Sequence, residues 1–214
     1  MSSDFRGKFS RSRRPKQKQV ERFLIVSEGT ETEPNYFRGF NLYVRPDIKV
    51  VGTGANTVAV VTQAIAERQK YHKNPEHRYD QVWCLFDKDD FSDQRFREAL
   101  RLAKEHDIHV AYSIESFELW FLLHFSLIHT EIGREAYLRK LSAHFKQLGY
   151  GAYRKNDKAI YDKLRPYQSQ ALRNAASLSQ GYLNETDILR HDPETTVNQL
   201  VEALNQQGKD RFDA

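Results

Sequence analysis

Short apolar runs alternate with segments of helical periodicity along the first half of the chain. The apolar runs have the length and composition of buried strands, and polar turns follow them. The predicted strands cover 22–27, 46–51, 81–86 and 108–114. Between them, apolar residues recur at helical spacing, for example at Val58, Val61 and Ile65. This alternation predicts an α/β fold with a parallel sheet, flanking helices and right-handed crossovers.

Local signals predict where two of the helices begin. Thr30 and Glu33 have the spacing of a capping box, and Pro34 is compatible with a helix only in its first turn. Asn56 precedes the apolar stripe of the next helix and is expected to cap it.

From residue 117 onward the pattern changes to helices without a clear strand. The apolar segment 117–129 is expected to pack on the sheet, and its periodicity continues in later segments. Those later helices are predicted over 134–148, 157–164, 168–180 and 194–206. The chain is therefore divided into a tail over 1–19, an α/β core over 20–116 and a helical region over 117–214 that packs on the core.

Acidic residues stand at the carboxyl ends of two predicted strands. Glu28 follows the first strand, and Asp87 and Asp89 follow the third. Ligands bind at this edge of an open α/β sheet, and side chains two residues apart on a strand point the same way. If the two strands are neighbours, the three carboxylates converge. Such oxygen ligands suit Mg²⁺ or Mn²⁺ and leave room for substrate phosphates.

Charge is unevenly distributed along the chain. Residues 1–19 hold seven basic side chains against one acid, whereas the remainder holds 26 basic against 28 acidic residues. A basic tail on a nearly neutral body favours contact with a nucleic-acid backbone, although a solvated tail that aids solubility is the alternative. No apolar run approaches a membrane span, and the polar start does not have the pattern of a signal peptide. We therefore expect a cytoplasmic protein with no membrane partner.

Other readings of the acidic segment are weaker. An EF-hand would require a ligand where Phe91 stands and a glycine where Ser92 stands. A receiver-type phosphoacceptor site would place its acidic pair after the first strand. The chain also has no Walker-type Gly-Lys-Ser/Thr motif, so it is not itself an ATPase.

Further charged residues have two readings each. Glu118 lies in an apolar helix, where a carboxylate requires either a salt bridge or a cation. Lys88 is either an exposed residue or a group that offsets phosphate charge. Basic side chains of the helical region are candidates for substrate binding, with an ordinary solvated surface as the alternative: Arg154, Lys155, Lys158 and Arg173.

The acidic pattern resembles that of Toprim proteins, in which a Glu after the first strand and an Asp-x-Asp after a later strand bind Mg²⁺ during phosphodiester chemistry. A longer resemblance, to the RloB family, covers about residues 20–205. It is carried by 23–29, 32–37, 83–90, 116–125 and 192–197. RloB-like proteins are Toprim-type proteins of restriction and phage-defence loci, often encoded beside an ABC-type ATPase, and they resemble the Toprim half of OLD nucleases.

The resemblance implies a metal-dependent nuclease effector with Glu28, Asp87 and Asp89 as the catalytic and metal-binding residues. Glu118 and Glu33 are weaker metal-ligand candidates. It also implies an ABC-type ATPase partner and a nucleic-acid substrate, DNA or RNA. A homo-oligomer is compatible with the sequence. The competing class is a non-catalytic adaptor, in which the same scaffold only binds nucleic acid or the ATPase.

Overall fold

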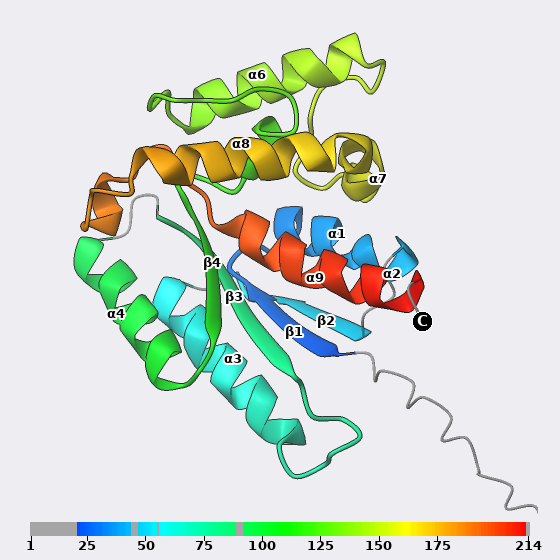
Figure 1. Cartoon of the computed structure of the whole chain (residues 1–214), viewed down its shortest axis with the longest axis vertical. Coiled ribbons are helices and arrows are strands. Elements are labelled where there is room, and N and C mark those ends of the chain that lie inside the picture. Colours follow the sequence, from blue (N-terminus) through cyan, green and yellow to red (C-terminus); the bar gives the residue numbers. More distant parts are fainter. Residues whose placement is uncertain (1–20, 44–46, 55, 89–91, 213–214) are drawn as a thin grey trace, which may run out of the picture.

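A four-stranded parallel sheet forms the centre of the protein. The computed structural model describes residues 21–43, 47–54, 56–88 and 92–212. The strands are β1 (Arg22–Ser27), β2 (Asp47–Gly52), β3 (Gln81–Lys88) and β4 (His109–Ile114). Their order in the sheet is β2-β1-β3-β4, and the three pairings are parallel. The predicted α/β fold with a parallel sheet is thus confirmed (Figure 1).

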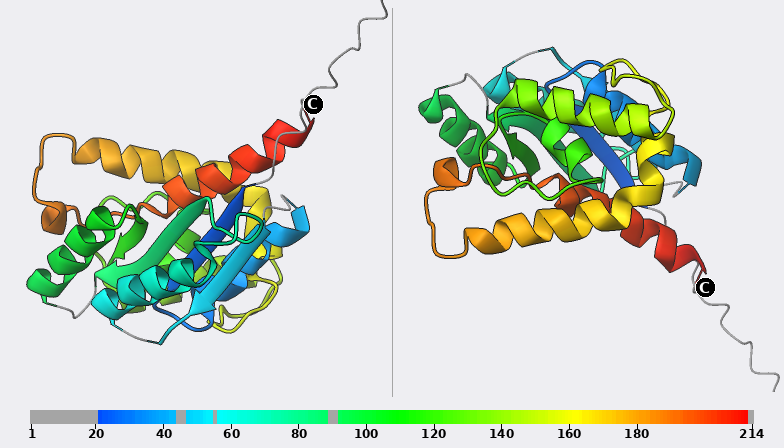
Figure 2. Two further views of the ribbon diagram at one scale, coloured as in Figure 1. Left: turned by 90° about the horizontal axis from the view of Figure 1, so that it is seen from below. Right: turned by 90° about the horizontal axis from the view of Figure 1, so that it is seen from above.

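Alternating strand residues form two separate apolar layers. Phe23, Ile25 and Leu85 face a cluster that contains the helices of the second half of the chain, together with α1 (Thr32–Arg38) and α2 (Phe40–Tyr43). Leu24, Val26 and their neighbours face α3 (Thr57–Tyr71) and α4 (Asp93–Glu105). This period of two explains why both faces of the sheet are apolar and both are covered by helices (Figure 2, left).

The second half of the described chain is helical and packs on the α1 side of the sheet, except that Ile188 and Leu189 pack against the layer of α3 and α4. Its elements are α5 (Glu118–Leu122), α6 (Arg134–Gln147), α7 (Ile160–Leu164), η1 (Arg165–Tyr167), α8 (Gln168–Gly181), η2 (Ile188–Arg190) and α9 (Val197–Phe212). Helix α9 contacts β4, α8 packs on α5 and α9, and α6 packs on α5 at the end of the molecule farthest from α3 (Figure 1). No helix in the described part of the chain is long and apolar enough to cross a membrane.

Some local predictions are confirmed and others are wrong. Asn56 caps α3, because its side chain accepts a hydrogen bond from the Ala59 N–H at 3.2 Å. The predicted capping box is wrong: α1 is preceded by Glu31 at its N-cap without a side-chain cap, and Glu33 bonds elsewhere. Within the apolar segment 117–129, helix α5 covers only Glu118–Leu122. After Leu122 the chain forms turns instead. In one of them the Phe125 N–H donates a hydrogen bond to the Leu122 carbonyl at 2.9 Å.

Candidate functional site

The order of the strands places a crevice between the carboxyl ends of β1 and β3. The chain leaves β1 toward β2 on one side, and leaves β3 toward β4 on the other, so the helices that follow these two strands lie on opposite faces. Ligands of open α/β sheets bind at such a switch point. Ser27 of β1 pairs with Leu85 of β3, and the Glu28 N–H donates to the Leu85 carbonyl at 2.9 Å. Glu28 and Asp87 therefore flank the crevice.

A third carboxylate is folded back over the loop that follows β1. The Gly29 N–H donates to Glu33 Oε1 at 3.1 Å, which draws this buried side chain from α1 toward the strand end. A Cβ on residue 29 would lie 2.1 Å from Glu33 Oε2, so any larger residue here would require the Glu33 carboxylate to shift. The loop sequence thus determines where the Glu33 carboxylate lies.

A fourth carboxylate enters the same place from α5. The side chain of Glu118 is 2% exposed, and its Oε1 atom accepts a hydrogen bond from the Tyr153 hydroxyl at 3.3 Å. The same oxygen lies 3.5 Å from Lys155 Nζ. Both readings of Glu118 are therefore compatible with the geometry, because it has an ion-pair partner and also faces the other carboxylates.

These groups line one cavity of about 220 Å³. Its acidic lining residues outnumber the basic ones, Arg134 and Lys155, by five to two, which gives an excess of three negative charges when all of them are ionised. The acids are Glu28, Glu31, Glu33, Asp87 and Glu118. An excess of carboxylates in a partly enclosed space favours protons or cations in the cavity.

The environment raises the pKa of two of these acids. Burial raises the pKa of Glu33, and the Glu118 charge adds to this effect, whereas backbone hydrogen bonds at Glu33 and Gly29 oppose it. Burial raises the pKa of Asp87 well above its usual range, and the nearby charges of Glu33 and Glu118 raise it further. Strongly perturbed acids in a cleft are typical of functional sites, although structural networks perturb them too.

The remaining predicted site residues lie in different places. Asp89 is outside the described residues, so its convergence with Asp87 stays a prediction. Lys88 is the last residue of β3, and its Nζ atom lies 3.2 Å from the Oδ1 atom of Asp93, at the start of α4. Of the basic side chains proposed for substrate binding, Lys155 lines the cavity, whereas the exposed Arg154, Lys158 and Arg173 do not.

A second acidic group, which sequence analysis did not predict, is formed by three residues from separate segments. Carboxylate oxygens of Glu115, Glu131 and Asp192 lie within 4.8 Å of one another, an arrangement compatible with a metal ion. Glu115 follows β4, Glu131 precedes α6 and Asp192 precedes α9. No local motif joins positions so far apart, because only the packing of the helical half on the sheet brings them together.

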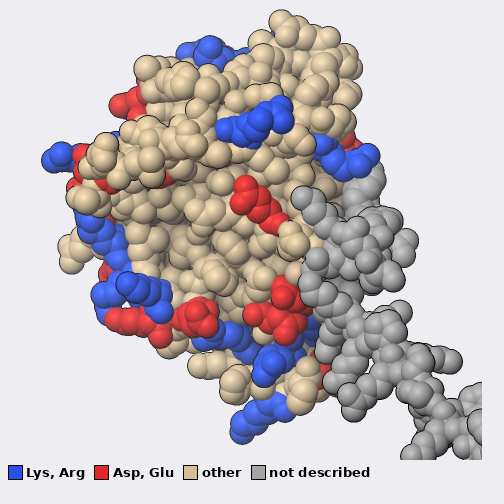
Figure 3. Space-filling model, in the orientation of Figure 1, with Lys and Arg blue, Asp and Glu red and all other residues tan. Residues whose placement is uncertain are grey.

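Charges elsewhere are mixed in sign on the face that Figure 3 presents. Basic and acidic side chains alternate around its rim, and most of its middle is uncharged. Among the described residues on this face there is accordingly no continuous basic surface of the kind that tracks a nucleic-acid backbone. The acidic cavity, rather than this face, is therefore the candidate functional site.

Comparison with known proteins gives one match. None of the curated proteins and none of the solved structures matches the chain. The family described as RloB-like protein matches residues 23–204. That match extends from β1 into α9, so it includes the residues that line the cavity and most of the helical half. Because the match spans most of its length, the chain belongs to the RloB-like family.

Proposed function

We propose that this protein is a metal-dependent nucleic-acid phosphodiester hydrolase, a nuclease effector of a prokaryotic phage-defence system. One observation carries the proposal. Four carboxylates from separate segments, Glu28, Glu33, Asp87 and Glu118, meet in one cavity at the carboxyl edge of a parallel sheet. Carboxylates that lie close together repel one another, and a cation bound in the cavity would compensate for this repulsion.

The donor atoms fit a hard divalent cation. The acidic lining offers only carboxylate oxygens, which are the ligands that Mg²⁺ and Mn²⁺ prefer, and its excess negative charge matches a divalent ion. Glu28 and Asp87 would hold the ion, with Asp89 as a further ligand and Glu33 or Glu118 completing the set. When bound, such an ion neutralises a phosphate and makes a coordinated water more acidic.

The chain's own residues have complementary tasks. Gly29 holds the Glu33 carboxylate through its N–H, and Tyr153 orients Glu118 by donating to Oε1. Lys155 is close enough to Glu118 to pair with it, yet its side chain remains 46% exposed. Its ammonium group can therefore also attract the phosphate of an incoming substrate.

The basic tail and the family resemblance support the proposed substrate and the proposed partner. Seven basic residues within 1–19 supply the charge for nucleic-acid attraction. The resemblance to Toprim proteins of defence loci adds phosphodiester chemistry, and it adds an ABC-type ATPase that would restrain or deliver the nuclease. The cytoplasm is the compartment in which such a system would act.

The test is cleavage of labelled single- and double-stranded DNA and RNA by the full chain with Mg²⁺ or Mn²⁺, alone and with the ATPase encoded beside it. We expect metal-dependent cleavage by the wild type and its loss, by at least about 100-fold, in Glu28→Gln and Asp87→Asn. The matched control is Glu98→Gln, which neutralises an exposed acid on α4 away from the cavity.

Two results would reject the nuclease proposal. One is cleavage that survives in both cavity variants. The other is an inactive wild type, with and without the ATPase, that still binds nucleic acid; this result would favour the adaptor.

A further inference from the structure

The group formed by Glu115, Glu131 and Asp192 shares no residue with the cavity lining. Their carboxylate oxygens lie within 4.8 Å of one another, Glu115 and Asp192 are partly buried, and Glu131 is exposed. Three ionised carboxylates at this distance repel one another strongly. Burial raises the pKa of Asp192 to about 6, and the charges of Glu131 and Glu115 contribute to this increase.

A buried hydroxyl beside this group lacks a partner. The side chain of Tyr137 is 0% exposed, and its hydroxyl makes no hydrogen bond within the described part of the chain. Burial raises the pKa of Tyr137, and the charges of Asp192, Glu115 and Glu131 raise it further, so the phenol lies within electrostatic reach of all three. The Asp192 Oδ1 atom is likewise shielded from solvent without a described partner. A buried polar group without a partner is unfavourable, so these two atoms favour a bound ligand at this group.

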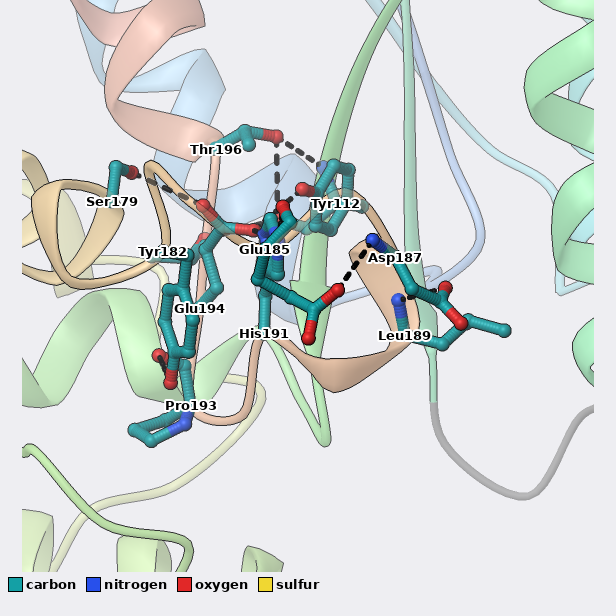
Figure 4. Close-up of polar contacts among 11 residues, drawn as sticks. Tyr112, Ser179, Tyr182, Glu185, Asp187, Leu189, His191, Pro193, Glu194 and Thr196 are labelled. Atoms are coloured by element: carbon teal, nitrogen blue, oxygen red, sulfur yellow. Dashed lines mark hydrogen bonds and ion pairs between the residues drawn. The ribbon is translucent and has the colours of Figure 1, made fainter.

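The backbone around Asp192 is already fixed. His191 Nδ1 lies 2.8 Å from Glu194 Oε2, and His191 Nε2 lies 3.0 Å from the Glu185 carbonyl oxygen. Glu194 Oε2 also accepts a hydrogen bond from the Tyr112 hydroxyl at 2.6 Å (Figure 4). These contacts tie the segment on both sides of Asp192 to β4, the strand that Glu115 follows. The backbone segments that carry Glu115 and Asp192 are thus held in place before any ligand arrives, which lowers the cost of binding.

We propose that Glu115, Glu131 and Asp192, with the Tyr137 hydroxyl behind them, bind a hard divalent cation at a site separate from the cavity. The ligand atoms are all oxygens, and the exposed Glu131 side leaves room for waters. The ion joins the end of β4, the loop before α6 and the segment before α9. Its role is to fasten the helical half to the sheet, so it stabilises the fold by mass action.

The test is a titration of the full chain with Mn²⁺, followed by electron paramagnetic resonance and by thermal melting. Glu131→Gln is the main variant, because an exposed side chain can be neutralised without disturbing the core. We expect it to remove one set of bound Mn²⁺ and to reduce the Mn²⁺-induced rise in melting temperature at least about twofold. Glu135→Gln, which neutralises an exposed acid at the start of α6, is the matched control and should titrate like the wild type.

The variants also separate this proposal from the nuclease proposal. Glu28→Gln should leave the Mn²⁺ that Glu131→Gln removes, whatever its effect on the cavity. Tyr137→Phe should keep the fold and weaken Mn²⁺ binding at this site several-fold. The proposal is overturned if Glu131→Gln binds Mn²⁺ and melts as the wild type does, or if Glu28→Gln alone removes all bound Mn²⁺.

Discussion

His124 lies in the hydrophobic layer beside α5, where the structure keeps it uncharged. Its side chain is 1% exposed, and its Nδ1 atom lies 3.0 Å from the Trp120 carbonyl oxygen, to which it donates. Its Nε2 atom has no hydrogen-bond partner in the described part of the chain. Burial lowers the pKa of His124 from 6.5 to about 4, although bonds to the Trp120 and Phe121 backbone oppose this effect. A histidine of this kind makes the fold sensitive to acid.

The sign and size of the effect follow from linkage. Between pH 6.5 and 4 the unfolded chain binds a proton at His124 that the native chain does not, so the free energy of unfolding falls as pH falls. The full difference is about 3 kcal/mol, because each pKa unit corresponds to about 1.4 kcal/mol. Between pH 7 and pH 5, roughly 2 kcal/mol of this penalty appears.

The replacement His124→Asn removes the titration while keeping a donor near the Trp120 carbonyl. Urea unfolding followed by circular dichroism at pH 7 and pH 5 gives the change in unfolding free energy for each protein. We expect the wild type to lose about 2 kcal/mol more than His124→Asn over this interval. The control His129→Asn, at an exposed histidine, should lose as much as the wild type. Equal losses in the wild type and His124→Asn would refute the assignment of a buried, neutral imidazole.

Two predictions concern the cavity. Gly29→Ala puts a methyl carbon 2.1 Å from Glu33 Oε2, so we expect a loss of roughly 1–3 kcal/mol in unfolding free energy and weaker Mn²⁺ binding. The control Gly181→Ala, with nothing within 4 Å of the added carbon, should lower neither quantity. If Gly29→Ala behaves as the wild type does, the position of the Glu33 carboxylate is not required for stability or for Mn²⁺ binding. Lys155→Met removes the cation 3.5 Å from Glu118, so thermal melting without metal should show a loss of about 1 kcal/mol and a larger stabilisation by Mn²⁺. Lys158→Met, at an exposed position outside the cavity, is its control, and identical melts for the two variants would contradict a role for the Lys155–Glu118 pair.

The sheet could be predicted from the sequence because each of its strands has a local signal. Each strand is an apolar run that a polar turn ends, and parallel strands bring their carboxyl ends to one edge. The proximity of Glu28 and Asp87 required one further condition, that β1 and β3 be neighbours, and the strand order meets it. The strand β3 continues through Asp87 and Lys88, two residues beyond the predicted end, so Asp87 is part of the sheet and pairs with Ser113.

Other parts of the site depend on contacts that no local pattern encodes. Thr30 and Glu33 have the spacing of a capping box, but the same Glu33 carboxylate can instead accept from the Gly29 N–H, and only the path of the loop decides between them. The contact between Lys155 and Glu118 spans the whole of α6, so neither residue's neighbours indicate it. Tertiary packing also creates the group of Glu115, Glu131 and Asp192.

Protons and cations compete for the same oxygens in the cavity. Burial and neighbouring carboxylates raise the pKa of Asp87 and of Glu33, so the native chain without metal binds more protons there than the unfolded chain. By linkage, these two groups make the native state less stable as pH rises through their raised pKa values. A divalent ion reverses this penalty, because it replaces the protons and compensates the charges that repel one another. The same carboxylates that weaken the fold without metal at neutral pH therefore provide the free energy for binding a cation, which is the state in which the proposed hydrolase would act.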